Sequence, residues 1–236
     1  TAEGANFKVI EFHGEAVRTL PTSGRLTLCN MTVEAGATGG VIPPDAETER
    51  YLRDEAGVKE PLDLFGPDAD AVYDQVIEVD VAKLEPQIAC PHTVDNVKPI
   101  GEVAGRKVQQ IVVGSCTNGR LDDLEVAARI LKGRKVAAGT RMLVFPASWR
   151  IYADALRLGY LRDIVAAGAV VCNPGCGPCL GVHQGALGDG ETALATTNRN
   201  FKGRMGNPNA EVFLCSTAVA AASALTGVIS DPRGVD

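Results

Sequence analysis

The stretch that decides the fold is IVVGSCTNGRLDDLEVAARIL, residues 111–131. Its first three residues form a short apolar run, which is typical of a buried strand. Four apolar residues then recur at helical spacing: Leu121, Leu124, Ala128 and Leu131. A strand that turns at once into a helix indicates one unit of a parallel α/β sheet.

Strand signals of the same kind follow this stretch. Short apolar runs occupy residues 142–145, 170–172, 193–196 and 212–214, and an alanine-rich helix is expected over 217–226, ended by Gly227. Strands that alternate with helices favour a parallel sheet that is covered on both faces. The loops at the carboxyl ends of its strands are then positioned for function.

Strands and helices are also expected in the N-terminal part. Apolar spacing predicts strands over 8–12 and 77–81, and helices over 22–38 and 46–56. Gly57 suits the left-handed position that ends the second helix. The first helix has an apolar stripe made of Leu26, Cys29, Val33 and Ala37. Asn30 and Glu34 lie beside this stripe, so their polar side chains are expected to project together.

Composition limits the class of protein. Of 236 residues, 45% are apolar and 22% charged, as in a globular protein of one or two domains. Prolines and glycines between residues 90 and 105 indicate a linker, which predicts α/β domains over 1–104 and 105–236. No apolar run approaches the ~20 residues of a membrane span and no secretory signal is present, so we expect a cytoplasmic location without a membrane partner. The net charge of −6 argues against binding to nucleic acid.

The cysteines carry the most information about function. Cys176 and Cys179 form a C-x2-C pair in a loop rich in glycine and proline, whose amides can donate to sulfur. Cys116 lies where a strand turns into a helix, and the positive end of that helix stabilises a thiolate. Thiols clustered in this way hold metal or perform chemistry in a reducing compartment.

The residues alone leave three interpretations open. A structural zinc site needs four ligands, which Cys116, Cys172, Cys176 and Cys179 could supply. The spacing of the last three also occurs in radical S-adenosylmethionine enzymes, although too little chain follows Cys179 for their long barrel. An iron–sulfur cluster held by Cys116, Cys176 and Cys179 would leave one iron without a protein thiolate, free to bind a substrate oxygen.

Several segments resemble the signature blocks of one family. GSCTN at 114–118, CGPCLG at 176–181 and NRNFKGR at 198–204 look like those of the aconitase superfamily of hydro-lyases. Residues 12–14 and 30–37 resemble further blocks, in the family's order. The resemblance implies an aconitase-like three-layer α/β/α fold with mostly parallel sheets in two α/β domains.

The resemblance also implies roles for particular residues. Cys116, Cys176 and Cys179 would bind a [4Fe–4S] cluster, with Asn30 and Asn198 as its neighbours. Glu34 would be catalytic, binding the water or hydroxide at the iron. Arg199 and Arg204 would bind substrate carboxylates, since a guanidinium can grip a carboxylate through two hydrogen bonds. The other cysteines are expected to act as small buried apolar residues: Cys29, Cys90, Cys172 and Cys215.

The reaction implied is the dehydration and rehydration of a hydroxy di- or tricarboxylic acid. The branch that the chain resembles most is the large subunit of 3-isopropylmalate dehydratase in leucine biosynthesis, with homoaconitase as the alternative. The family's N-terminal region is expected to be missing, and a separate small subunit to carry the swivel domain. Further alternatives are a catalytically incomplete cluster-binding fragment and a structural zinc module. The chain alone is expected to turn over little substrate, because a general base contributes roughly 10²–10⁴-fold.

Overall fold

The computed structural model describes residues 3–235. The chain divides into two compact units, with the boundary in the sequence between Leu84 and Glu85. The sequence placed this boundary after residue 104. The structure places it earlier because β3 pairs with β9 and β4, so the expected linker is part of the larger sheet. Each unit is described by itself below. Among residues 3–235, no helix has the length and apolarity that crossing a membrane requires.

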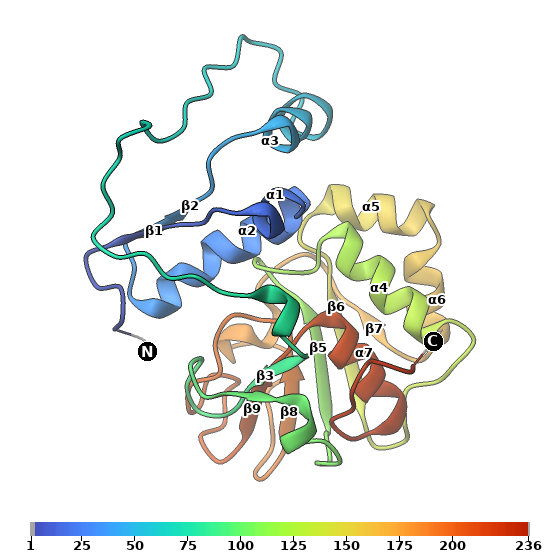
Figure 1. Ribbon diagram of the computed structural model, residues 1–236. Coiled ribbons are helices and arrows are strands. Elements are labelled where there is room, and N and C mark those ends of the chain that lie inside the picture. The colour runs from blue at the N-terminus through green and yellow to red at the C-terminus, as the bar shows by residue number, and fades with distance from the viewer. Residues whose placement is uncertain (1–2, 236) are drawn as a thin grey trace. The chain divides into compact units, whose positions relative to one another are not determined.

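The larger unit is built on a seven-stranded sheet with the order β4-β3-β9-β8-β5-β6-β7 (Figure 1). Its strands are β3 (Gln87–Ala89), β4 (Val97–Pro99), β5 (Gln110–Gly114), β6 (Arg141–Phe145), β7 (Val170–Val171), β8 (Thr192–Ala195) and β9 (Glu211–Leu214). The five strands from β9 to β7 are parallel, and β3 pairs antiparallel with β9 on one side and with β4 on the other. The prediction of a mostly parallel α/β fold is therefore confirmed.

Four helices pack together over one face of this sheet. They are α4 (Leu121–Leu131), α5 (Trp149–Arg157), α6 (Tyr160–Ala166) and α7 (Thr217–Thr226). Ile111 and Val113 of β5 point into the core that these helices share with the sheet. Gly227 ends α7 in the left-handed conformation that the sequence predicted, with φ 75°. The strand and helix of the stretch 111–131 are thus observed where they were expected.

The opposite face of the sheet carries a second apolar core. Val112, Phe145 and Ala195 lie in it, together with Leu187 and Met205 from loops. In the described part of this unit, loops supply the members of this core that do not lie on strands, where the sequence led us to expect a helical layer. The face that carries the cysteine loops is therefore covered by irregular chain.

The smaller unit has a two-stranded parallel sheet and short helices. Its elements are β1 (Val9–Glu11), α1 (Glu15–Arg18), α2 (Thr22–Met31), β2 (Gly39–Val41) and α3 (Ala46–Arg50), with a 3₁₀ turn at Thr32–Ala35, a π turn at Tyr51–Glu55 and a 3₁₀ turn at Val81–Lys83. Helix α3 and the π turn fill the range expected for the second helix. Gly57 follows with φ 73°, as predicted.

The first predicted helix is shorter than expected. It was predicted to reach residue 38, but α2 ends at Met31 and a 3₁₀ turn ends at the left-handed Gly36. Because residues of a 3₁₀ turn are spaced differently around the axis, the predicted stripe does not continue. Val33 is 51% exposed, whereas Glu34 is only 6% exposed. The sequence predicted Val33 in the apolar stripe and Glu34 beside it, but the structure exposes Val33 and buries Glu34.

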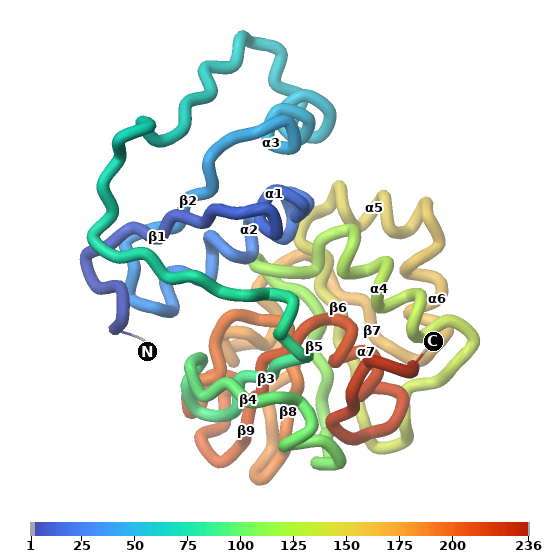
Figure 2. The backbone as a smooth tube through the Cα atoms, viewed as in Figure 1, coloured from blue at the N-terminus to red at the C-terminus, as the bar shows by residue number. Residues whose placement is uncertain are grey.

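The predicted strand at 77–81 is wrong. Residues 56–80 run without regular structure in Figure 2, and Ile77 and Val79 are exposed by 74% and 63%. Alternation of apolar and acidic residues predicts a strand only if a neighbouring strand accepts its hydrogen bonds. In the described part of the chain, these residues have no such neighbour. The later part of this segment is held near the end of β1, where the Tyr73 hydroxyl lies 3.3 Å from Nε2 of His13.

An ion pair organises the smaller unit. The guanidinium of Arg25 binds both oxygens of Asp45, at 2.6 and 2.8 Å, and also donates to the carbonyls of Arg18 and Leu20. Asp45 in turn accepts from the first amides of α3. The hydrogen bond from Arg25 holds the pKa of Asp45 below its usual value. One buried side chain thus connects α2, the preceding turn and α3.

We expect Arg25→Met to lower the free energy of unfolding by about 2–3 kcal/mol. Loss of one partner of a buried pair costs about 3–5 kcal/mol, and the 30% exposure of Asp45 reduces this value. Urea unfolding followed by circular dichroism measures the change. The exposed Lys59, replaced by Met, is the matched control and should change stability little. Equal stability of the two variants would contradict this role of Arg25.

Candidate functional site

Three loops follow parallel strands of the larger unit and contain the candidate cluster residues. Residues 115–120 follow β5, residues 172–181 follow β7, and residues 196–206 follow β8. Strands β8, β5, β6 and β7 are neighbours and all run parallel. The loops therefore leave the same edge of the sheet, which is where α/β proteins place their sites.

Phe145, at the end of β6, joins the first two loops. Its ring is 1% exposed and lies against Gly177, where an added Cβ would be 2.7 Å from the ring. Gly114 and Gly119 lie against the main-chain carbonyl of the same residue, with no room for a side chain. The loop of Cys116 and the loop of Cys176 therefore rest on one aromatic residue.

The third loop is joined to both of the others. Asn118 Nδ2 donates to the carbonyl of Thr196 at 2.6 Å, and the hydroxyl of Thr196 accepts from the amide of Gly114 at 2.8 Å. Gly181 has φ 72°, and a Cβ on it would collide with the main chain of Gly206. The short distance between the loop of Cys179 and the loop of Arg204 thus requires glycine at position 181.

Gly181→Ala is expected to destabilise the larger unit by about 2–5 kcal/mol. The left-handed conformation costs a residue with a Cβ about 1–2 kcal/mol, and forcing the two loops apart adds about 1–3 kcal/mol. Thermal or urea unfolding measures the loss. Gly175→Ala in the same loop is the control, since no atom lies within 4 Å of a Cβ there. Similar stabilities of the two variants would contradict this account of the loop packing.

The three candidate cysteines are free thiols with different environments. Cys116 and Cys176 are exposed, whereas Cys179 is 5% exposed. The thiol of Cys179 donates to Asn198 Oδ1 at 3.8 Å, and Nη2 of Arg204 donates to the Cys179 sulfur at 3.6 Å. The structure thus brings Cys179, Asn198 and Arg204 together. Arg199 lies in the same loop, half-buried.

Buried polar atoms without hydrogen bonds gather in these loops. Within the described residues, no partner is found for Nε of Arg120, Oγ1 of Thr197, Oδ1 of Asn200 or Nε of Arg204. Most buried polar groups in proteins have a partner, so each exception needs an explanation. Arg204 is the most informative, because its Nη2 already donates to the Cys179 sulfur. A buried donor beside a thiol fits a site that receives an anionic group.

The donor set fits an iron–sulfur cluster better than a single metal ion. Among residues 3–235, no three His, Cys, Asp or Glu side chains are arranged to hold one ion. A closed zinc site would need four such ligands around one centre. Thiolates of an iron–sulfur cluster bind different irons, and a donor such as Arg204 stabilises the sulfur atom beside it. The residues present therefore fit the cluster.

The other four cysteines have the character of buried thiols. Burial raises the pKa of Cys29, Cys90 and Cys172, and raises that of Cys215 to about 12. Cys172 donates to the carbonyl of Val170 at 3.9 Å. A raised pKa keeps the thiol protonated, and only the thiolate is a good metal ligand.

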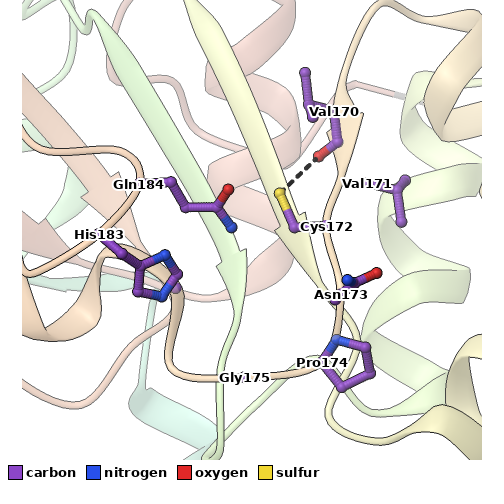
Figure 3. A pocket seen from close by; sticks show the side chains of 9 residues that line it. Val170, Val171, Cys172, Asn173, Pro174, Gly175, His183 and Gln184 are labelled. Atoms are coloured by element: carbon purple, nitrogen blue, oxygen red, sulfur yellow. Dashed lines mark hydrogen bonds between the residues drawn. The ribbon is translucent and has the colours of Figure 1, made fainter.

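A hollow of about 460 Å³ lies beside the loop of Cys176. Cys172, His183 and Gln184 line it, as Figure 3 shows, together with Gly175 and Gly177, which flank Cys176. The wall of the hollow is therefore continuous with the cysteine loop.

Asn30 and Glu34 belong to the smaller unit. Asn30 is exposed in the last turn of α2. Glu34 lies in the following 3₁₀ turn, and its side chain is buried although it carries a carboxyl group. Charged groups are rarely buried to this extent without a specific partner or function.

The opposite end of the strands is held by a separate ion pair. Arg141, at the start of β6, binds the carboxylate of Glu191 and also donates to Gln110 at 2.7 Å. Gln110 in turn donates to the carbonyl of Gly185 at 2.7 Å. The hydrogen bond from Arg141 lowers the pKa of Glu191 to about 2. These contacts fix the chain that returns from the cysteine loop to β8.

The Glu191 pair should make stability depend on pH. Because the folded pKa is lowered, the pair stabilises the protein fully above the unfolded value of about 4.3 and loses this effect as the pH falls to about 2. Partial exposure limits the effect to about 1 kcal/mol. Urea unfolding at a series of pH values should show a shallower acid loss for Glu191→Gln than for the wild type. Glu102→Gln is an exposed control, and an unchanged slope for Glu191→Gln would contradict the prediction.

Comparison with known proteins identifies the family. The model of the aconitase family (aconitate hydratase) matches residues 1–107 and 101–227. The chain belongs to the aconitase family. The two matches cover both units, so membership includes the loops of the cysteines and the segment of Asn30 and Glu34.

Relatives within the family are similar over nearly the whole chain. The "3-isopropylmalate dehydratase large subunit 2" of Archaeoglobus fulgidus is 54% identical over 98% of this chain and 55% of the relative. The "3-isopropylmalate dehydratase large subunit" of Elusimicrobium minutum is 51% identical over 99% of this chain and 56% of its own length. The "Probable methanogen homoaconitase large subunit" of Methanosarcina mazei is 50% identical over 98% and 58%. The chain thus spans little more than half the length of these relatives.

Sequence reasoning missed several residues that hold the site together. Phe145 was predicted only as part of a strand. Nothing in the sequence around it indicates that it contacts two of the loops. Asp123, which accepts from the amides of Gly119 and Arg120, was also missed. An acidic residue in the first turn of a helix is a known signal for such a contact, so Asp123 could have been found.

Proposed function

We propose that this chain is part of the large subunit of a [4Fe–4S] hydro-lyase that isomerises a hydroxy dicarboxylic acid. The observation that carries the proposal is the contact of Asn198 and Arg204 with the Cys179 sulfur, inside a set of interlocked loops. The names of the relatives favour 3-isopropylmalate dehydratase, with homoaconitase as the alternative. Location in the cytoplasm stays a prediction from the sequence.

Cys116, Cys176 and Cys179 would hold the cluster. When bound with three protein thiolates, the cluster supplies a Lewis acid for the hydroxyl group of the substrate. Asn198 orients the Cys179 side chain through its amide oxygen, and Arg204 places positive charge beside the same sulfur. Positive charge there stabilises the thiolate and also favours an anionic substrate.

The substrate carboxylates would be bound by arginines of the third loop. Arg199 and Arg204 are both half-buried, so water would compete little for their hydrogen bonds to a bound carboxylate. We assign Glu34 to proton transfer at the oxygen of the departing hydroxyl, with Asn30 beside the cluster. A buried carboxyl group is suited to this work because bulk water does not compete for the proton that it transfers.

The complete enzyme would need further chain. The names of the relatives as large subunits support a separate small subunit as partner. The relatives also contain sequence that this chain does not match. Since a missing general base lowers rates by roughly 10²–10⁴-fold, we expect the isolated chain to bind the cluster without sustaining turnover.

The test is to measure the reaction with a complete large subunit that contains this sequence, together with its small subunit. After anaerobic reconstitution, dehydration of 3-isopropylmalate and of homocitrate is followed by the absorbance of the unsaturated product. Faster turnover of 3-isopropylmalate supports the main proposal, and faster turnover of homocitrate supports the alternative. An intact cluster without turnover of either acid would overturn both.

A further inference from the structure

Asp123 connects the loop of Cys116 to a second helix. Its Oδ2 accepts from the amides of Gly119 and Arg120, at 2.9 and 3.1 Å, and its Oδ1 accepts from the hydroxyl of Thr217 at 2.8 Å. Thr217 is the first residue of α7 and is 6% exposed. The carboxylate thus holds the end of the loop and the first turns of α4 and α7 at one point.

This arrangement exceeds an ordinary helix cap. An acidic residue at the third helical position commonly reaches back to the amide that precedes the helix. Asp123 also accepts from Gly119, one residue earlier, and from another helix. Asp123 is half-buried, and desolvation raises its pKa. A carboxylate that satisfies three donors is costly to replace by a neutral group.

Cys116 depends on this support because its own side chain is held weakly. In the described structure, its sulfur makes one contact, at 4.0 Å from the Thr117 hydroxyl. The main chain of the loop therefore determines where the thiol lies. Asn118 holds the middle of the loop to Thr196, and Ala147 donates to the carbonyl of Gly119. Asp123 supplies the remaining hydrogen bonds at the end of the loop.

We propose that Asp123 is a positioning residue for the cluster ligand Cys116. It acts through the amides of Gly119 and Arg120 and is itself oriented by Thr217. The proposal rests on the proposed function, because it assigns Cys116 to the cluster. Asparagine at position 123 keeps the shape but exchanges one acceptor oxygen for a donor. Either the bond to Thr217 reverses its direction or the loop amides lose their acceptor, and in both cases the amides lose a charged acceptor.

The first test uses the chain without cluster. Hydrogen exchange of the amides at residues 115–120 should be about tenfold faster in Asp123→Asn than in the wild type, because hydrogen bonds to a charged acceptor are lost. Thr217→Val should have the same effect in the same segment. Asp122→Asn, on the neighbouring residue, is the matched control and should leave this segment unchanged. Equal exchange in Asp123→Asn and Asp122→Asn would overturn the proposal.

The second test uses the chain reconstituted anaerobically with iron and sulfide. Asp123→Asn should lose its cluster to a chelator about tenfold faster than Asp122→Asn and, after reduction with dithionite, should show a changed electron paramagnetic resonance spectrum of the cluster. Asp123→Glu, which keeps the charge, should restore part of the lifetime. Equal loss rates and spectra would overturn the proposal, since a purely structural role changes only the unfolding midpoint. If the wild type takes up no cluster, the proposed function fails, while the exchange measurement still decides whether Asp123 fixes the loop.

Discussion

Alanine in place of Cys176 or Cys179 is expected to reduce iron and sulfide to below about a tenth of the wild-type content after reconstitution. Three thiolates hold the cluster in this account, so loss of one leaves two irons without a protein thiolate. The effect should be larger at Cys179, because Asn198 and Arg204 are already arranged around its sulfur. Metal and sulfide analysis of the purified variants measures the loss.

Cys172→Ala and Cys215→Ala are the matched controls. Cys172 is buried and Cys215 is partly buried against the core, and desolvation raises the pKa of each thiol. Their variants should keep a full cluster, with at most a modest loss of stability from the small cavity that is created. A variant of Cys172 that lost the cluster would instead indicate four thiol ligands, and the assignment of an open iron would be wrong.

Glu34→Gln is expected to lower kcat of the complete enzyme by roughly 10²–10⁴-fold with little change in KM, as for loss of a residue that transfers protons. The isosteric amide keeps the buried volume and removes only the capacity to transfer a proton. Steady-state kinetics with the small subunit present measures the effect. Cluster content of the variant should equal that of the wild type, since Glu34 is not a ligand in this account.

Glu49→Gln serves as the control for Glu34→Gln. Glu49 is exposed in α3, within the same unit, and its neutralisation should leave kcat unchanged. A Glu34→Gln variant with wild-type kcat would remove this residue from the mechanism. Unfolding measurements on the same variant would then show whether the buried side chain of Glu34 stabilises the fold instead.

The sequence predicted the larger unit well because its signals are local. The residues 111–113 are apolar enough to be a central strand, and the helix that follows has a regular apolar face that α6 and α7 cover. Strands β6, β8 and β9 were predicted for the same reason. The short strand β4 was assigned to a linker because Pro91 and Pro99 dominate the local pattern, and β3 was not predicted at all. Only the pairing of β3 with β9 and with β4 makes them part of the sheet.

The smaller unit was predicted less well because its burial does not follow one helical period. A change from α-helix to 3₁₀ turn at Thr32 exposes Val33 and buries Glu34. The sequence gives no sign of this change before Gly36. At Ile77 and Val79 the local pattern was present but the structure that it predicts was not. The residues alternate as in a strand, yet no partner strand lies beside them in the described residues.

The candidate site residues were predicted from motifs, but the residues that hold the site loops in place were not. The cysteine spacing and the arginine loop suggested ligands and substrate contacts, but the contact of Arg204 with Cys179 depends on the close approach of Gly181 to Gly206. Phe145 and Asp123 bring the loops together through contacts between distant segments. Such contacts are a property of the folded chain, so residue spacing alone could not predict them.

The most direct test of the central claim is to reconstitute the chain anaerobically with iron, sulfide and zinc present together, to determine the bound metals and the sulfide, and to record the electron paramagnetic resonance spectrum after reduction with dithionite. The account predicts about four irons and four sulfides per chain, the composition of a [4Fe–4S] cluster, with an iron–sulfur spectrum and little zinc. Near-stoichiometric zinc without sulfide would contradict it.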